Sequence, residues 1–214
     1  MQKNTDALQC YLVLDATVCG SEKNMLAIAC AAVDAGITMI QLRMKNWSAQ
    51  RCMALARQVK HLLSDRSIPL IINDDIEIAL AVDAAGIHVG QQDLPPQKVR
   101  ALVGSEKWLG LSISSEKELM HLPAHYIDYL GVGPIFQTAS KKDAVSPIGL
   151  TTLEHIVKLV YPMPVVAIGG INRAHIQTLR KTGIRGIAVI AAICCHPNPG
   201  EATRQLVRDW RMLS

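Results

Sequence analysis

Two aliphatic runs in the sequence each lead up to a carboxylate. Residues 71–75 read Ile-Ile-Asn-Asp-Asp, and residues 88–93 read His-Val-Gly-Gln-Gln-Asp. We expect both runs to be strands that deliver Asp74 and Asp93 to a common rim. Two carboxylates at one rim suit a hard divalent cation such as Mg²⁺, which prefers oxygen ligands. Together with the many phosphate-binding groups elsewhere in the chain, this pattern predicts enzymatic chemistry on a diphosphate.

The same acids also have an ordinary structural interpretation. Asp74 or Asp75 could be the N-cap of a helix that begins at Ile76. Asp93 could cap a helix that is entered through the proline pair at Pro95. We favour the metal interpretation because both acids are expected at one rim.

A basic segment ends another predicted strand. Residues 41–45 read Gln-Leu-Arg-Met-Lys, and strand residues alternate between faces, so Gln41, Arg43 and Lys45 share one side. An inward arginine beside a lysine is costly without an anion, which favours an anion-binding role. The alternative is a solvated strand end with Arg43 paired to a neighbouring acid. Ser112 also ends a predicted strand, so we expect its hydroxyl to reach the rim.

Two further segments suit phosphate. Residues 137–143 read Gln-Thr-Ala-Ser-Lys-Lys-Asp and lie in the longest irregular stretch, which could be a lid. Its hydroxyls and lysines suit phosphate oxygens, although a solvated basic loop is the alternative. Gly169 and Gly170 end one predicted strand and residues 188–193 follow another, and backbone N–H groups there could bind an oxyanion.

Apolar β-rich runs alternate with helix-period segments along the whole chain. The predicted helices include residues 25–35, 48–63, 150–160 and 173–182. Gly36, Gly86 and Gly183 stand where glycine would close a helix. Eight βα units without a linker predict one (β/α)8 barrel, an α/β TIM barrel over residues 1–214, with a doubly wound open sheet as the alternative. The predicted strands are residues 11–15, 38–43, 70–73, 87–90, 109–113, 129–133, 165–169 and 186–190.

Composition narrows the class of protein. The 214 residues are 50% hydrophobic and 19% charged, with a net charge of +4 and a single Phe. A large core is possible, and the scarcity of aromatic residues disfavours a binder of single-stranded nucleic acid. No secretory signal or membrane span is apparent, so we expect a soluble cytoplasmic protein. The six cysteines form no CxxC pair and are expected to be buried free thiols, with a redox role for Cys194 and Cys195 as the weaker alternative.

The histidines and nucleophiles suggest no other chemistry. His88 lies inside a predicted strand and is expected to be a core imidazole, whereas His155, His175 and His196 are expected at the surface. No GxSxG motif or Cys–His arrangement indicates a covalent nucleophile.

These segments together resemble the thiamine-phosphate synthase family. The likeness runs from Tyr11 to about Ile193, and the order and spacing of its motifs make it specific. The motifs are QLRMK, IINDD, GIHVGQQDL, LGLS, YLGVGPIFQTASKK, VVAIGGI and GIAVIAAI.

The resemblance implies a (β/α)8 barrel transferase. Its reaction joins 4-amino-2-methyl-5-(diphosphooxymethyl)pyrimidine to 4-methyl-5-(2-phosphooxyethyl)thiazole and releases diphosphate, with Mg²⁺ held here by Asp74 and Asp93. The residues implied to hold the pyrimidine diphosphate are Gln41, Arg43, Lys45, Asn73, Ser112 and Lys141. The residues implied to hold the thiazole phosphate are Thr138, Ala139, Ser140, Gly170, Ile190 and Ala191.

The chain departs from the family pattern in a few places. Ala191 stands where many relatives have Ser, Ser140 replaces a common Thr, and Gln137 replaces a common Pro. A related branch isomerises a thiazole carboxylate phosphate, but retention of the basic, amide and acidic site residues argues for the synthase. A barrel that only binds a phosphorylated ligand is the alternative of a different class. A homo-oligomer is possible.

Overall fold

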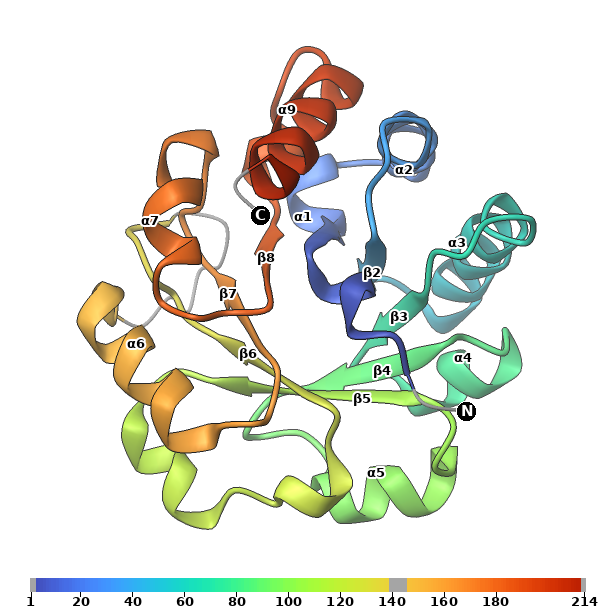
Figure 1. Ribbon diagram of the computed structural model, residues 1–214. Coiled ribbons are helices and arrows are strands. Elements are labelled where there is room, and N and C mark those ends of the chain that lie inside the picture. Colours follow the sequence, from blue (N-terminus) through green and yellow to red (C-terminus); the bar gives the residue numbers. More distant parts are fainter. Residues whose placement is uncertain (1–2, 139–145, 213–214) are drawn as a thin grey trace.

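Eight parallel strands form a closed barrel in the computed structural model, which describes residues 3–138 and 146–212 (Figure 1). Each strand pairs with the next in the sequence, and β1 pairs with β8 through the register Tyr11–Ala188. This closing pair excludes the open-sheet alternative. The strands are β1 (Cys10–Asp15), β2 (Met39–Arg43), β3 (Leu70–Asn73), β4 (Gly86–Val89), β5 (Trp108–Ile113), β6 (Tyr129–Val132), β7 (Val165–Ile168) and β8 (Gly186–Val189).

Helices surround the ring of strands, as Figure 1 shows. The α-helices are α1 (Ala16–Cys19), α2 (Glu22–Asp34), α3 (Ala49–Leu62), α4 (Ile76–Ala81), α5 (Pro96–Val103), α6 (Gly149–Val160), α7 (Ile176–Arg180), α8 (Ala191–Cys194) and α9 (Pro199–Arg211). Short 3₁₀ segments are η1 (Thr5–Leu8), η2 (Glu116–His121), η3 (Ala124–Tyr126) and η4 (Arg173–His175). The connection from β5 to β6 therefore carries two 3₁₀ segments in place of an α-helix.

The predicted (β/α)8 barrel is confirmed, and its eight predicted strands each end within one residue of the observed bounds. The ends of the helices were predicted less accurately than those of the strands. The helix predicted from residue 25 begins at Glu22, because the Ser21 side chain accepts a hydrogen bond from Asn24 N and caps it. The helix predicted over residues 173–182 is η4 followed by α7, which ends at Arg180.

One of the three predicted helix-closing glycines has a different role. Gly36 and Gly183 have φ of 89° and 82°, as expected for residues that follow a helix. Gly86 instead lies inside β4, where a Cβ would be 2.3 Å from the carbonyl oxygen of Trp108. It is glycine because two neighbouring strands approach closely there.

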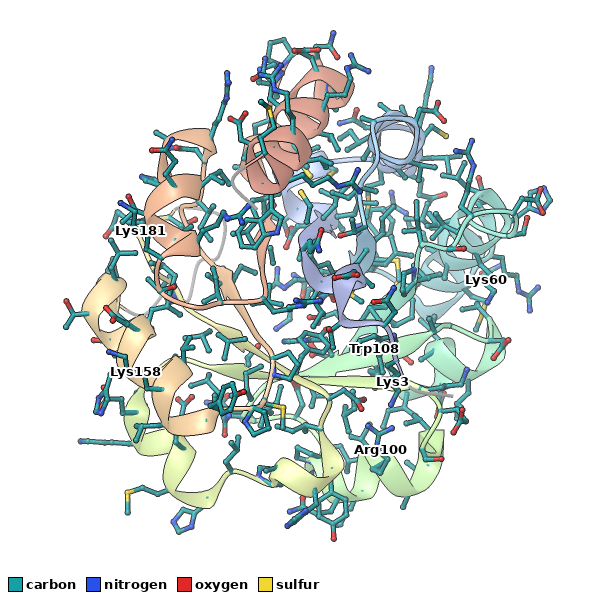
Figure 2. All side chains as sticks on the ribbon, in the orientation of Figure 1. Lys3, Lys60, Arg100, Trp108, Lys158 and Lys181 are labelled. Atoms are coloured by element: carbon teal, nitrogen blue, oxygen red, sulfur yellow. The ribbon has the colours of Figure 1, made fainter. Side chains whose placement is uncertain are left out.

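The N-terminal ends of β5 and β6 are tied together by Asp128. Its carboxylate accepts hydrogen bonds from Lys3 at 2.8 Å, Arg100 at 2.7 Å and the Leu109 backbone N–H at 2.7 Å. Lys3 also lies 5.9 Å from the ring centroid of Trp108, and Figure 2 labels both residues and Arg100. Polar contacts at this end of a barrel serve stability, because the active sites of such barrels lie at the opposite end.

Four of the six cysteines are buried, and none of the six is in a disulfide. Cys30 is half-buried and Cys195 is exposed, so the prediction of burial is wrong for Cys195, which lies just beyond the last turn of α8. Among the described residues, no helix combines the length and the apolar character needed to cross a membrane.

Candidate active site

A cavity of about 860 Å³ lies at the C-terminal ends of β4 to β8. This volume is within the usual range for small-molecule sites, and this end of a (β/α)8 barrel is where such sites are found. Side chains and bare backbone both line it, including Gln91, Ser112, Thr138, Gly170 and Ala191. Several of the residues predicted from sequence therefore face one cavity.

Asp74 and Asp93 lie side by side at the rim, as the sequence predicted. The Asp74 backbone N–H donates to the His88 carbonyl at 2.9 Å, and Asp93 Oδ2 accepts from the Gly90 backbone N–H at 2.7 Å. Burial and the adjacent, hydrogen-bonded Asp93 carboxyl raise the pKa of Asp74 to about 6, while Lys45 and Arg43 oppose this rise. Two carboxylates that repel each other in this way are relieved by a shared proton or a cation.

The helix-cap interpretation applies to neither of these two acids. Asp75 is the N-cap of α4, and its Oδ1 accepts from the Ile78 backbone N–H at 2.9 Å. Asp74 has a φ of 64°, which lies in the left-handed region, whereas the N-cap residue Asp75 has an extended backbone. The N-cap position of α5 is Pro95, which makes no side-chain cap bond, so the cap prediction for Asp93 is wrong.

Asp74 faces a groove of about 270 Å³ that is also lined by Lys45 and Asn73. Lys45 Nζ lies 3.8 Å from Asp74 Oδ2, and the Lys45 side chain is 52% exposed. Among the described residues, no three His, Cys, Asp or Glu side chains form a metal-ligating cluster. A cation held by Asp74 and Asp93 would thus keep coordination positions open for substrate oxygens, which is the usual arrangement for Mg²⁺ at phosphates.

Arg43 is fixed by a buried acid that the sequence analysis overlooked. Asp15 Oδ2 accepts from Arg43 Nη1, and Asp15 Oδ1 caps α1 by accepting from the backbone N–H groups of Thr17 at 2.8 Å and Val18 at 3.2 Å. The Arg–acid pairing considered as an alternative is therefore present. Because the two oxygens of Asp15 have different partners, the guanidinium is held in one orientation beside the cavity. The signal was available, since Asp15 ends an aliphatic run as Asp74 does.

Gln41, Arg43, Asn73 and Ser112 meet around a small cavity of about 30 Å³ in the barrel interior. It shares Ser112, Gly131 and Ile168 with the large cavity. Four of the six residues predicted to hold the pyrimidine diphosphate are thus brought together. Lys45 lies in the adjoining groove described above, and Lys141 lies outside the described residues.

The strand ends of β7 and β8 bring three of the predicted thiazole phosphate residues to the large cavity, namely Gly170, Ile190 and Ala191. Gly170 has a φ of 64°, and a Cβ there would be 2.5 Å from the Gln137 carbonyl oxygen. Ile190 is the N-cap residue of α8, so the N–H groups of Ala191 and Ala192 belong to a first helical turn and have no intrahelical acceptor. Thr138 lines the same cavity. Ala139 and Ser140 lie outside the described residues.

The predictions for the histidines hold with one exception. His88 is 8% exposed, and its two ring nitrogens lie 3.0 Å from the Tyr129 hydroxyl and 2.9 Å from Ser112 Oγ. His155 and His196 are exposed, but His175 is half-buried and stacks on Phe136 with ring centroids 3.9 Å apart.

Comparison with known proteins agrees with this arrangement. The family described as thiamine monophosphate synthase matches residues 10–193, from the start of β1 into α8. The chain belongs to this family. It is 44% identical over 201 residues to a thiamine-phosphate synthase of Desulfitobacterium hafniense, covering 94% of this chain and 96% of the relative. A thiamine-phosphate synthase of Psychrobacter sp. is 40% identical over 208 residues, covering 96% of each chain.

A solved structure extends the match to the fold. Thiamine phosphate pyrophosphorylase from Pyrococcus furiosus superimposes with a TM-score of 0.86 at 30% identity and covers 98% of both chains. The resemblance inferred from the sequence motifs is confirmed. The family acts on small molecules, which agrees with a cavity of this size.

Proposed function

We propose that the chain is a transferase that joins 4-amino-2-methyl-5-(diphosphooxymethyl)pyrimidine to 4-methyl-5-(2-phosphooxyethyl)thiazole, giving thiamine monophosphate and diphosphate. The observation that carries this proposal is the Asp74–Asp93 carboxylate pair at the barrel rim beside Lys45, with the pKa of Asp74 raised to about 6. Membership of the family and relatives named thiamine-phosphate synthase support it.

In this proposal the two substrates occupy different halves of the rim. The diphosphate lies near Arg43, Lys45 and Asn73, on the side of β2 and β3, and Lys141 also contacts it. The thiazole phosphate lies near Gly170 and the Ile190–Ala191 backbone, on the side of β7 and β8, with Thr138, Ala139 and Ser140 from the preceding loop. The support for this division is that the two residue sets line separate, adjoining spaces.

Asp74 and Asp93 would hold Mg²⁺, which would add positive charge beside the departing diphosphate. The chemistry requires no protein nucleophile. The bond from the pyrimidine methylene carbon to the diphosphate oxygen breaks, and its electron pair leaves on that oxygen. The aminopyrimidine ring stabilises the methylene cation, and the thiazole nitrogen then attacks the methylene carbon.

The residues of the chain contribute charge and position. Arg43, Lys45 and Lys141 stabilise the negative charge that grows on the leaving group. Arg43 is effective because Asp15 orients it before the substrate binds. The barrel rim places the thiazole nitrogen close to the methylene carbon, which makes the second step effectively intramolecular.

The test mixes the pure protein, Mg²⁺ and both phosphorylated substrates, and detects thiamine monophosphate by mass and diphosphate by a coupled assay. We expect thiamine monophosphate to form, its formation to stop when the metal is removed, and its formation to resume when Mg²⁺ is added back. Binding of the thiazole phosphate without diphosphate release would indicate a ligand-binding barrel. Isomerisation of a thiazole carboxylate phosphate without condensation would indicate the tautomerase branch.

A further inference from the structure

Five side chains form one continuous series of hydrogen bonds across the barrel interior. Gln41 Nε2 donates to the Tyr11 hydroxyl at 2.7 Å, and that hydroxyl lies 3.0 Å from the Tyr129 hydroxyl. The Tyr129 hydroxyl lies 3.0 Å from His88 Nδ1, and His88 Nε2 lies 2.9 Å from Ser112 Oγ. We call this series the Gln41–Ser112 relay. Both of its ends are residues proposed above to hold the pyrimidine substrate.

Four of the five relay residues are buried, and Ser112 is half-buried. Tyr129 is 0%, Tyr11 2%, Gln41 5% and His88 8% exposed. Burial raises the pKa of both tyrosines above the usual value, so each phenol keeps its proton. A buried hydroxyl proton without an acceptor is costly, so each of these protons must point along the series.

This requirement couples the two ends of the relay. Consider a neutral His88 imidazole. If Gln41 donates an amide N–H to the Tyr11 hydroxyl, Tyr11 must donate its own proton to Tyr129. Tyr129 must then donate to His88 Nδ1, which places the imidazole proton on Nε2 and directs it at Ser112. If the Gln41 amide is reversed, every bond reverses and the imidazole proton moves to Nδ1. If the two directions converge, one phenol proton has no acceptor, and if they diverge, the Tyr11 and Tyr129 oxygens lie 3.0 Å apart with no proton between them.

Two glycines make room for the relay in the sheet. Gly110 lies between the strands of His88 and Tyr129, paired with each of them in the sheet register. A Cβ on Gly110 would be 2.3 Å from the Tyr129 ring and 2.4 Å from His88 Nδ1. A Cβ on Gly131 would be 3.0 Å from His88 Cε1. Both rings therefore occupy space that any other residue at these strand positions would fill.

We infer that the Gln41–Ser112 relay recognises the 4-amino group of the pyrimidine substrate. Tyr11, Tyr129 and His88 are positioning residues that orient the side chains of Gln41 and Ser112. This inference rests on the proposed function. In the direction found here, the Gln41 side-chain oxygen is left to accept a hydrogen bond and the Ser112 hydroxyl proton is left to donate one. A 4-aminopyrimidine offers the complementary amino donor and ring-nitrogen acceptor. A 4-oxopyrimidine offers the opposite pattern, so accommodating it requires reversal of the whole relay.

The first test compares the 4-amino and 4-oxo forms of the pyrimidine diphosphate by calorimetric titration, without the thiazole phosphate. Wild-type protein is expected to prefer the amino form. Tyr129→Phe keeps the ring but removes the hydroxyl in the middle of the relay, so that each half can reorient on its own. The preference for the amino form should then fall about tenfold, which corresponds to the loss of about one net hydrogen bond. Tyr126→Phe, at a residue 41% exposed and outside the relay, is the control. An unchanged preference in folded Tyr129→Phe would overturn the inference.

The second test reads the imidazole proton directly. Long-range ¹⁵N–¹H correlation spectra of the ligand-free protein, with His88 assigned from its loss in His88→Gln, should show the Nε2–H tautomer in wild type and a mixture in Tyr129→Phe. A wild-type Nδ1–H tautomer, or a doubly protonated ring, would overturn the relay. This readout is independent of turnover. Failure to form thiamine monophosphate with an Nε2–H tautomer present would reject the proposed function and leave the relay direction standing.

Discussion

At the scale of single residues, Asp74 and Asp75 have separate tasks although they are adjacent in sequence. Asp75 caps α4, whereas Asp74 faces Asp93 and Lys45. We expect Asp75→Ala to lower the free energy of unfolding by about 1 kcal/mol through loss of the cap and to keep turnover. Asp74→Ala should instead abolish most turnover and the response to Mg²⁺ while the fold is retained. Denaturant melts and initial rates measured on both variants would check this, and near-normal turnover in Asp74→Ala would remove the metal assignment.

The raised pKa of Asp74 sets a pH dependence for the metal-free protein. A carboxyl with a pKa of about 6 in the folded state, against about 3.9 in the unfolded chain, binds more protons when folded between those values. Folding stability contributed by this group is therefore lost as the pH rises from about 4 to 6, and the carboxylate pair is a net cost above pH 6.

We therefore expect metal-free Asp93→Asn to be more stable than metal-free wild type at pH 8, by on the order of 1 kcal/mol. The difference should shrink as the pH falls below about 6, because Asp74 of the wild type then takes up the proton that relieves the repulsion. Urea titrations in the presence of a chelator would measure it. Added Mg²⁺ should stabilise only the wild type, and a variant that is less stable at pH 8 would show that the two carboxylates do not repel each other.

At the scale of elements, the loop ahead of α6 and the β7 strand end depend on each other. Gly170 has a positive φ, and a side chain there would meet the Gln137 carbonyl oxygen. We expect Gly170→Val to displace the loop backbone and weaken thiazole phosphate binding by roughly 1.5–3 kcal/mol. Ala191→Ser should leave the binding nearly unchanged, because Ala191 is exposed at the start of α8. Calorimetry with the thiazole phosphate, beside circular dichroism, separates a binding loss from unfolding. Unchanged affinity in folded Gly170→Val would place the phosphate elsewhere.

The strands could be predicted from sequence because each is a short, mostly aliphatic run between segments of a different pattern. The site could be predicted in part for the same reason, since the residues after strand ends converge in a barrel. Tyr11 and Tyr129 were not assigned roles, because each lies in a mostly aliphatic run and its partners are far away in sequence. Asp15 was overlooked although it ends such a run, because its partner Arg43 lies on the next strand. The distance from Tyr11 to Tyr129 is 118 residues along the chain, and only barrel closure brings the two hydroxyls together.

At the scale of the whole molecule, we expect the N-terminal end of the barrel to serve stability and the C-terminal end to serve catalysis, so that a substitution at one end has little effect on the other. Asp128 holds Lys3, Arg100 and the Leu109 N–H at the N-terminal end of the strands. We expect Asp128→Ala to lower the free energy of unfolding by about 1–3 kcal/mol, because it leaves these donors without their acceptor. The kcat and KM values at a temperature below the melting range should stay within about twofold of wild type. A large change in kcat would show that the N-terminal end is coupled to the rim.

The division of the rim between two substrates also bears on inhibition. The groove beside Asp74 shares Asn73 with the small interior cavity, and that cavity shares Ser112 with the larger cavity beside Gly170. A single compound that carries a diphosphate mimic at one end and a phosphate at the other would reach both. Once the first end is bound, the second is present at a high effective concentration, so a linker of matching length multiplies the affinity of the two halves without any new contact. A bisubstrate compound of this kind is the natural starting point for a tight ligand of this barrel.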